Sequence, residues 1–150
     1  MIKFARYCLL ASLFVCFALS PAQSQQIKEA RLPTPEDHFA KLNTARIHYQ
    51  NYGKGKEALV FVHGWTCNLT FWKANIPAFT GQTRVIAIDL PGHGRSHGAP
   101  VSSLDAMVDA VVNAMPVRTH LLGWSLGGHT AMAIAYRHPA RVDKLVTVCA

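Results

Sequence analysis

Three short apolar runs dominate the chain beyond residue 57. They are Ala58 to Val62, Val85 to Ile88, and the pair Leu121 and Leu122, which stands just before a glycine-containing segment. Uninterrupted apolar runs of this length are typical of parallel strands that are buried on both faces. Because segments with helical periodicity alternate with such runs, the pattern predicts an α/β fold with a doubly wound, mostly parallel sheet.

Helices are predicted on both sides of the third run. Between residues 104 and 115 apolar residues recur at helical spacing, Ser102 and Asp105 offer a capping box, and Pro116 ends the helix. A second helix is expected from residue 126 to about residue 138. Its glycines and alanines give it a thin profile that can lie close against the sheet.

The segment ahead of the first run predicts a tether followed by a strand. Residues 25–40 are expected to be the tether, because the stretch from Gln25 to Pro35 is polar and contains two prolines. Residues 47–52 alternate apolar and polar positions well enough for an antiparallel strand. The glycines at residues 53 and 55 supply a turn into the first apolar run, and residues 41–150 form one continuous domain unit.

The first 24 residues have the pattern of a secretory signal peptide. Lys3 and Arg6 precede an apolar stretch, residues 7–19, that is too short for a comfortable membrane span, and small residues follow at cleavage spacing. We expect cleavage near Ser24, an exported mature chain that is periplasmic or secreted, and no stable membrane span after cleavage. An uncleaved N-terminal anchor is the alternative.

The glycine-containing segment after the third run carries the main candidate chemistry. It reads Gly123-Trp124-Ser125-Leu126-Gly127, between a predicted strand and a predicted helix. A serine on such a sharp turn has its hydroxyl exposed at the C-terminal end of the strand, next to the free N–H groups of the helix start. Ser125 is therefore the candidate nucleophile.

The loops after the other two runs extend this pattern to a family. The first run leads into His63-Gly64-Trp65, and the second leads into the segment from Asp89 to Ser96. In this order and spacing the three elements resemble the α/β-hydrolase family from about residue 45 onward, and in motif they are most similar to small serine carboxylesterases of the pimeloyl-carrier-protein methyl esterase type. The resemblance implies an opening hairpin formed by residues 47–52 and the first run.

The resemblance also implies roles for two residues beside Ser125. The backbone N–H groups of Trp65 and Leu126 would form the oxyanion hole, and the side chains of both would line the acyl pocket for a small-molecule ester substrate. Perhydrolase, carbon–carbon hydrolase and peptidase relatives share the serine. Dehalogenase and epoxide-hydrolase relatives place an aspartate there, so Ser125 argues against them.

The family's triad order is serine, then acid, then histidine, each on a later loop. Residues 143–148 predict the next parallel strand, and the sequence ends at Ala150, before such loops. Asp89 resembles a loop-bracing aspartate, and His63 resembles a support for the oxyanion loop. We therefore expect an N-terminal hydrolase fragment that lacks the triad acid, the triad histidine, the C-terminal strands and the lid. Such a chain would be inactive alone and would fold poorly around an exposed apolar edge strand; the alternative is a truncated non-catalytic product.

Composition narrows the possible partners. The formal net charge of +7 falls by two when Lys3 and Arg6 leave with the signal peptide, and the remaining excess is scattered, so no nucleic-acid partner is expected. Cys67 and Cys149 are expected to be free thiols in the mature chain. No sequence motif calls for a cofactor or a metal, and the oligomeric state stays open.

Overall fold

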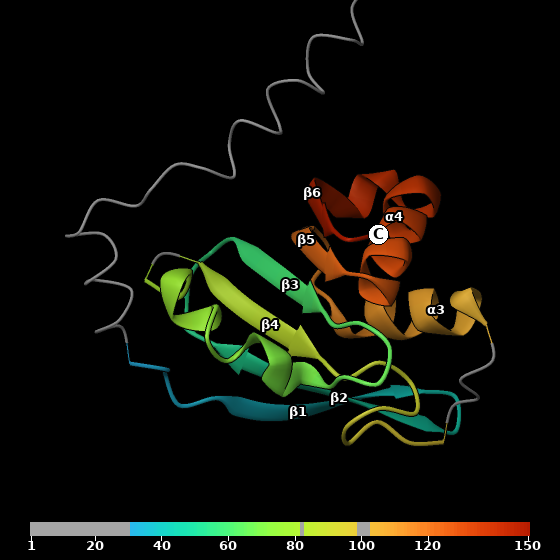
Figure 1. Cartoon of the computed structure of the whole chain (residues 1–150), viewed down its shortest axis with the longest axis horizontal. Helices are drawn as coiled ribbons and strands as arrows, with labels where there is room; N and C mark the ends of the chain where they lie inside the picture. Colours follow the sequence, from blue (N-terminus) through green and yellow to red (C-terminus); the bar gives the residue numbers. More distant parts are fainter. Residues whose placement is uncertain (1–30, 82, 99–102) are drawn as a thin grey trace, which may run out of the picture. The chain divides into compact units, whose positions relative to one another are not determined.

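A computed structural model describes residues 31–81, 83–98 and 103–150 (Figure 1). The predicted signal peptide, residues 1–24, and the first part of the predicted tether lie outside the described residues, as does Ser102. Six strands form one sheet in the order β1-β2-β4-β3-β5-β6. Their bounds are Glu36–Leu42 for β1, Ala45–Tyr52 for β2, Ala58–Val62 for β3, Arg84–Ile88 for β4, Thr119–Trp124 for β5 and Val142–Val148 for β6.

The helices follow the strands in alternation. The α-helices are α3, Leu104–Ala114, and α4, Leu126–Arg137; the short 3-10 helices are η2, Leu69–Trp72, η3, Ile76–Ala78, and η4, Pro139–Arg141. Strands β4, β3, β5 and β6 run parallel, whereas β2 pairs antiparallel with β4 and β1 pairs antiparallel with β2. The predicted α/β fold with a mostly parallel sheet is confirmed.

Strand β3 is buried on both faces, as its uninterrupted apolar run predicts. Val60 and Val62 belong to the core cluster that includes residues of α3 and α4. Leu59 and Phe61 belong to a second cluster with residues of η2 and η3, in which the rings of Phe61 and Trp72 stack with centroids 4.8 Å apart. The sheet is therefore covered on both sides, and β3 lies near its middle.

The start of the folded chain differs from the prediction in two ways. Residues 36–40, predicted to be tether, form most of β1, which pairs antiparallel with β2 along its whole length. The hairpin expected between residues 47–52 and β3 is also wrong, because β2 pairs with β1 and β4. The fully apolar β3 instead takes parallel partners on both edges, β4 and β5, and the half-buried β2 lies farther out.

The helix boundaries are close to those predicted. In α3 the N-cap is Ser103, whose Oγ accepts a hydrogen bond from the Ala106 N–H at 3.2 Å, so the cap lies one residue after the predicted Ser102. The C-cap of α3 is Met115, immediately before Pro116. Helix α4 begins at Leu126 and ends at Arg137, one residue before the predicted end.

Strand β6 lies at the edge of the sheet and is largely exposed. All of its residues after Val142 are exposed, including Leu145, Val146 and Val148. The described residues thus end in the exposed apolar strand that the sequence predicts. Among the described residues Cys67 and Cys149 form no disulfide, and Cys149 is exposed. None of the helices in the described parts of the chain has the length and apolar character needed to cross a membrane.

Candidate active site

Ser125 stands in a strained turn between β5 and α4. Its φ of 53° and ψ of −118° lie outside the regions that residues with a side chain favour. The Ser125 N–H donates to the Val148 carbonyl at 2.9 Å, and the Ser125 carbonyl accepts from the His129 N–H at 3.1 Å. The side chain makes no capping hydrogen bond to α4. Strain of this kind is typical of functional sites and persists only where the surroundings impose it.

Two glycines allow neighbouring parts of the chain to pack closely against this turn. A Cβ atom at Gly127 would overlap the carbonyl oxygen of Val62, so the first turn of α4 lies directly on the end of β3. A Cβ atom at Gly64 would come within 2.7 Å of the Trp124 ring and 3.3 Å of Ser125 Cβ. The loop after β3 therefore lies directly against the turn at Ser125.

The two predicted oxyanion donors flank this contact. Leu126 is the first residue of α4, where backbone N–H groups have no partner within the helix. Among residues 31–81, 83–98 and 103–150, neither the Trp65 N–H nor the Leu126 N–H donates a hydrogen bond. The Trp65 side chain is 56% exposed, whereas that of Leu126 is partly buried against the core. The assignment of both N–H groups to an oxyanion hole stays a prediction.

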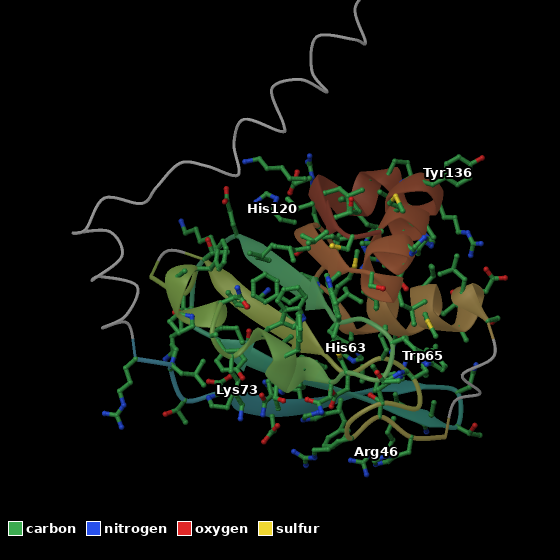
Figure 2. All side chains as sticks on the ribbon, in the orientation of Figure 1. Arg46, His63, Trp65, Lys73, His120 and Tyr136 are labelled. Atoms are coloured by element: carbon green, nitrogen blue, oxygen red, sulfur yellow. The ribbon has the colours of Figure 1, made fainter. Side chains whose placement is uncertain are left out.

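His63 connects the loop after β3 to the loop after β4. It lies fully buried beside Trp65 beyond the end of β3 (Figure 2). Its Nε2 accepts from the Leu90 N–H at 3.0 Å, so its Nδ1 carries the proton and donates to the Gly64 carbonyl at 2.8 Å. Burial lowers the pKa of His63 below its ordinary value of 6.5. His63 therefore holds the loop after β3 against the loop after β4, and the oxyanion role of the held loop stays a prediction.

Asp89 braces the loop that follows β4. Its carboxylate accepts from the backbone N–H groups of Leu69 at 2.7 Å and Arg95 at 2.9 Å, and it lies 2.7 Å from His48 Nδ1. Both Asp89 and His48 are 2% exposed. With donors from three parts of the chain on its oxygens, Asp89 is a structural residue, as the sequence predicts.

His48 is a buried polar residue that sequence reasoning missed. Its Nε2 lies 2.7 Å from Asp37 Oδ1, so both ring nitrogens face carboxylates. The hydrogen bond from His48 lowers the pKa of the Asp37 carboxyl below its usual value. The only signal in the sequence was a histidine in an otherwise half-apolar strand.

The described histidines supply no base for the Ser125 hydroxyl. His129 lies one turn into α4, and its Nδ1 is 3.1 Å from the Ser125 carbonyl oxygen. Within the described residues no histidine nitrogen hydrogen-bonds to Ser125 Oγ, and no group of three His, Cys, Asp or Glu side chains is arranged to hold a metal ion. The described part of the candidate site thus contains Ser125 and the two backbone N–H groups predicted to be donors.

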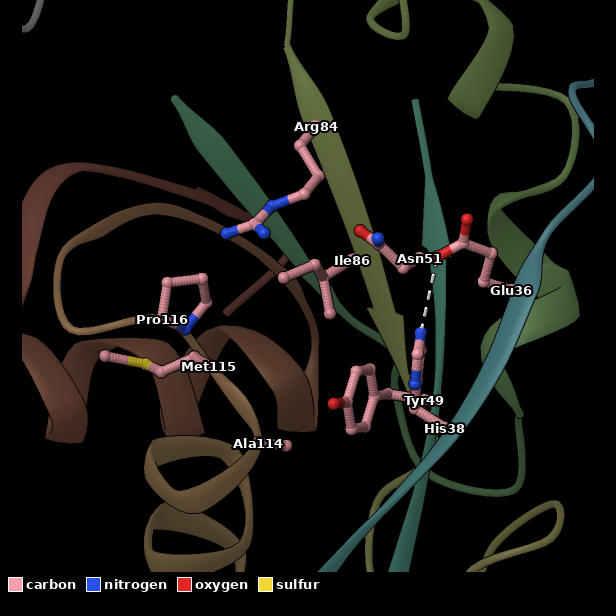
Figure 3. A pocket seen from close by; sticks show the side chains of 9 residues that line it. All are labelled: Glu36, His38, Tyr49, Asn51, Arg84, Ile86, Ala114, Met115 and Pro116. Atoms are coloured by element: carbon pink, nitrogen blue, oxygen red, sulfur yellow. Dashed lines mark ion pairs between the residues drawn. The ribbon is translucent and has the colours of Figure 1, made fainter. Parts of the chain in front are cut away.

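A separate hollow lies away from these residues, between the outer strands and the end of α3 (Figure 3). It has a volume of about 370 Å³, and Tyr49, Arg84 and Met115 are among its lining residues. Ser125, Trp65 and Leu126 do not line it. The hollow is therefore no part of the candidate active site.

Comparison with known proteins gives consistent matches. A family model described as alpha/beta hydrolase fold matches residues 57–150. The pimeloyl-[acyl-carrier protein] methyl ester esterase of Pectobacterium carotovorum is 43% identical over 104 residues, which are 69% of this chain and 41% of that protein. The protein of the same name from Edwardsiella ictaluri is 42% identical over 102 residues, 68% of this chain and 40% of that protein. The chain thus spans about two fifths of the length of these curated relatives.

A solved structure gives the same result for the fold. The crystal structure of a hydrolase from Pseudomonas aeruginosa matches with a TM-score of 0.68 at 30% identity. The match covers 75% of this chain and 45% of that chain. The fold described above therefore also occurs in a solved hydrolase structure.

We expect Gly127→Ala to destabilise the fold by about 3 kcal/mol, because the added methyl group meets the backbone of β3, which has no room to move. Gly81→Ala is the matched control, since a Cβ atom there meets nothing within 4 Å. Its effect should be within about 0.5 kcal/mol. Urea unfolding of both variants measures the difference, and equal midpoints would contradict the close packing of α4 on β3.

We expect stability to fall as the pH drops below 6.5, in part because of His63. The folded state holds this ring neutral with a lowered pKa, so the unfolded chain binds the proton more readily and gains from acidification. His63→Gln should reduce the loss of thermal stability between pH 7.5 and pH 5.5. Melting curves across this range test the expectation, and identical slopes for wild type and His63→Gln would refute it.

Proposed function

Because this chain belongs to the α/β-hydrolase fold family, we propose that Ser125 is the nucleophile of a serine hydrolase that cleaves a carboxylic ester through an acyl-enzyme. The family that the motifs resemble is confirmed by the match over residues 57–150. The observation that carries the proposal is the strained backbone of Ser125, whose hydroxyl makes no capping bond to α4.

The proposed reaction has two halves. Ser125 Oγ attacks the carbonyl carbon of the ester while its proton passes to a general base, and the carbonyl oxygen becomes an oxyanion. The Trp65 and Leu126 N–H groups donate to this oxyanion, and the N-terminal end of α4 stabilises its charge. The C–O bond to the alcohol then breaks, the alcohol leaves with the proton from the base, and water releases the acid from Ser125.

We propose that the general base and the acid that orients it come from sequence beyond these 150 residues. Two features support this. The described histidines nearest the turn are engaged with backbone groups, as His63 and His129 show, and Asp89 is occupied by donors from three parts of the chain. The chain spans about two fifths of the length of its curated relatives. Ser125 alone would be a weak nucleophile near neutral pH.

The proposed substrate is a small or medium acyl ester. Two curated relatives named pimeloyl-[acyl-carrier protein] methyl ester esterase support an ester of a carboxylic acid. Trp65, more than half exposed beside the nucleophile turn, offers an apolar surface for the acyl chain. If the protein instead has the perhydrolase, carbon–carbon hydrolase or peptidase activity of other relatives with this serine, it would act on substrates other than esters.

Export is a separate proposal that rests on the sequence of residues 1–24. Two basic residues, a short apolar stretch and small residues at cleavage spacing support it. Cys67 and Cys149 remain in the mature chain as free thiols.

We expect Ser125→Ala to lower kcat for methyl or p-nitrophenyl esters of short and medium acids by roughly 10³-fold or more in the protein as its gene encodes it. Ser103→Ala is the control: it removes the cap of α3 and leaves kcat within about 2-fold, because a helix cap affects stability only. The 150-residue chain alone should show no turnover. Ester turnover by that chain, abolished in Ser125→Ala, would contradict the proposal that the base lies elsewhere.

We expect the exported protein to begin near Gln25. Mass spectrometry of the N-terminal peptide from the periplasmic or secreted fraction measures this directly. A protein that keeps residues 1–24 and stays with the membrane fraction would show an anchor in place of a signal peptide.

A further inference from the structure

The oxyanion loop contains a backbone conformation that needs support. Thr66 directly follows Trp65 and has a φ of 61°, in the left-handed region that β-branched residues avoid. Its side-chain hydroxyl donates to the Trp65 carbonyl at 2.7 Å, and the Cys67 N–H donates to the Gly64 carbonyl at 3.3 Å. These contacts tighten the loop from within, but they do not anchor it to the rest of the protein.

His63 anchors the loop by a hydrogen bond to one peptide group, whose planarity then fixes the direction of the next N–H. The Gly64 carbonyl and the Trp65 N–H belong to the same planar unit and point in opposite directions. The His63 Nδ1–H donates to that carbonyl at 2.8 Å, so it also sets the direction of the Trp65 N–H. His63 is held in turn by the Leu90 N–H, which comes from the loop after β4.

His93 mirrors this arrangement from the other loop. Its Nε2 accepts the Thr66 N–H at 3.3 Å, and its Nδ1–H donates to the Pro91 carbonyl at 2.9 Å. Each histidine therefore donates to its own loop and accepts from the other loop, and the two rings lie with centroids 5.3 Å apart. The His93 ring also meets the Trp65 ring edge to face, with centroids 5.3 Å apart.

We propose that His93 is a positioning residue for the oxyanion donor: it fixes the peptide that follows Trp65, while His63 fixes the peptide that precedes it. Held on both sides, the Trp65 N–H keeps its direction before any substrate binds. A donor that is already aimed costs no reorganisation when the oxyanion forms, which is the source of its effect on rate. The inference rests on the proposed function of Trp65 as an oxyanion donor.

The test compares three variants of the protein as its gene encodes it. His93→Ala removes the acceptor for the Thr66 N–H, and we expect kcat for ester hydrolysis to fall about 10- to 100-fold with KM changed less than about 3-fold, somewhat less than the loss of a whole donor. His93→Gln keeps an acceptor oxygen and should restore kcat to within about 3-fold of wild type. His97→Ala is the matched control, because His97 is exposed on the same loop and only its backbone contacts Arg46.

A second measurement separates positioning from general loss of structure. A trifluoromethyl ketone binds as a hemiketal oxyanion, so its Ki should rise in His93→Ala by the same factor as kcat falls, while the KM of the substrate stays nearly constant. Melting temperatures check that each variant is folded. The inference would be overturned if both His93 variants had a lower kcat and a higher KM by similar factors, and if Ki rose no more than KM did.

Nuclear magnetic resonance keeps the inference distinct from the proposed function. We expect the spectra of the wild-type protein to show the His93 ring as its Nδ1–H tautomer. We also expect the Trp65 amide signal to shift in His93→Ala and to return to its wild-type position in His93→Gln. These results in a protein without ester hydrolysis would support the positioning and overturn only the proposed function. If the wild-type protein hydrolyses esters and His93→Ala behaves like His97→Ala, the positioning is overturned and the proposed function stands.

Discussion

The close contact between the first turn of α4 and the C-terminal end of β3 determines the geometry of the candidate site. At Gly127 the helix touches the Val62 carbonyl with no side chain between them. Because the helix lies this close, the chain must turn sharply after β5, and Ser125 takes up the turn with an unfavourable φ of 53°. The two buried clusters on the faces of the sheet stabilise the elements on either side and so maintain the strain at one residue.

Two kinds of histidine hold the loops around this turn. His63 and His93 are hydrogen-bonded as neutral rings, each with one nitrogen donating and the other accepting a backbone N–H. His48 instead lies between the carboxylates of Asp37 and Asp89, with one ring nitrogen 2.7 Å from each. His63 and His93 align backbone groups of the two loops, while His48 ties β1 and β2 to the loop after β4.

The sequence predicts the parallel strands and the serine turn well, because their signals are local. The uninterrupted run of β3 and the glycines around Ser125 each depend on near neighbours only. The tether assigned to residues 36–40 was wrong because β1 is polar at its start, and its pairing with β2, including the contact of Asp37 with His48, appears only in three dimensions. The link between His93 and Thr66 spans 27 residues and has no local signal.

The central claim is that Ser125 carries the acyl group during ester hydrolysis. Mass spectrometry of the protein quenched during turnover of a slowly hydrolysed ester measures this directly. The account predicts a peptide containing Ser125 that is heavier by the mass of the acyl group, absent in Ser125→Ala. An acyl group on Cys67, or active turnover with no covalent intermediate on any residue, would contradict it.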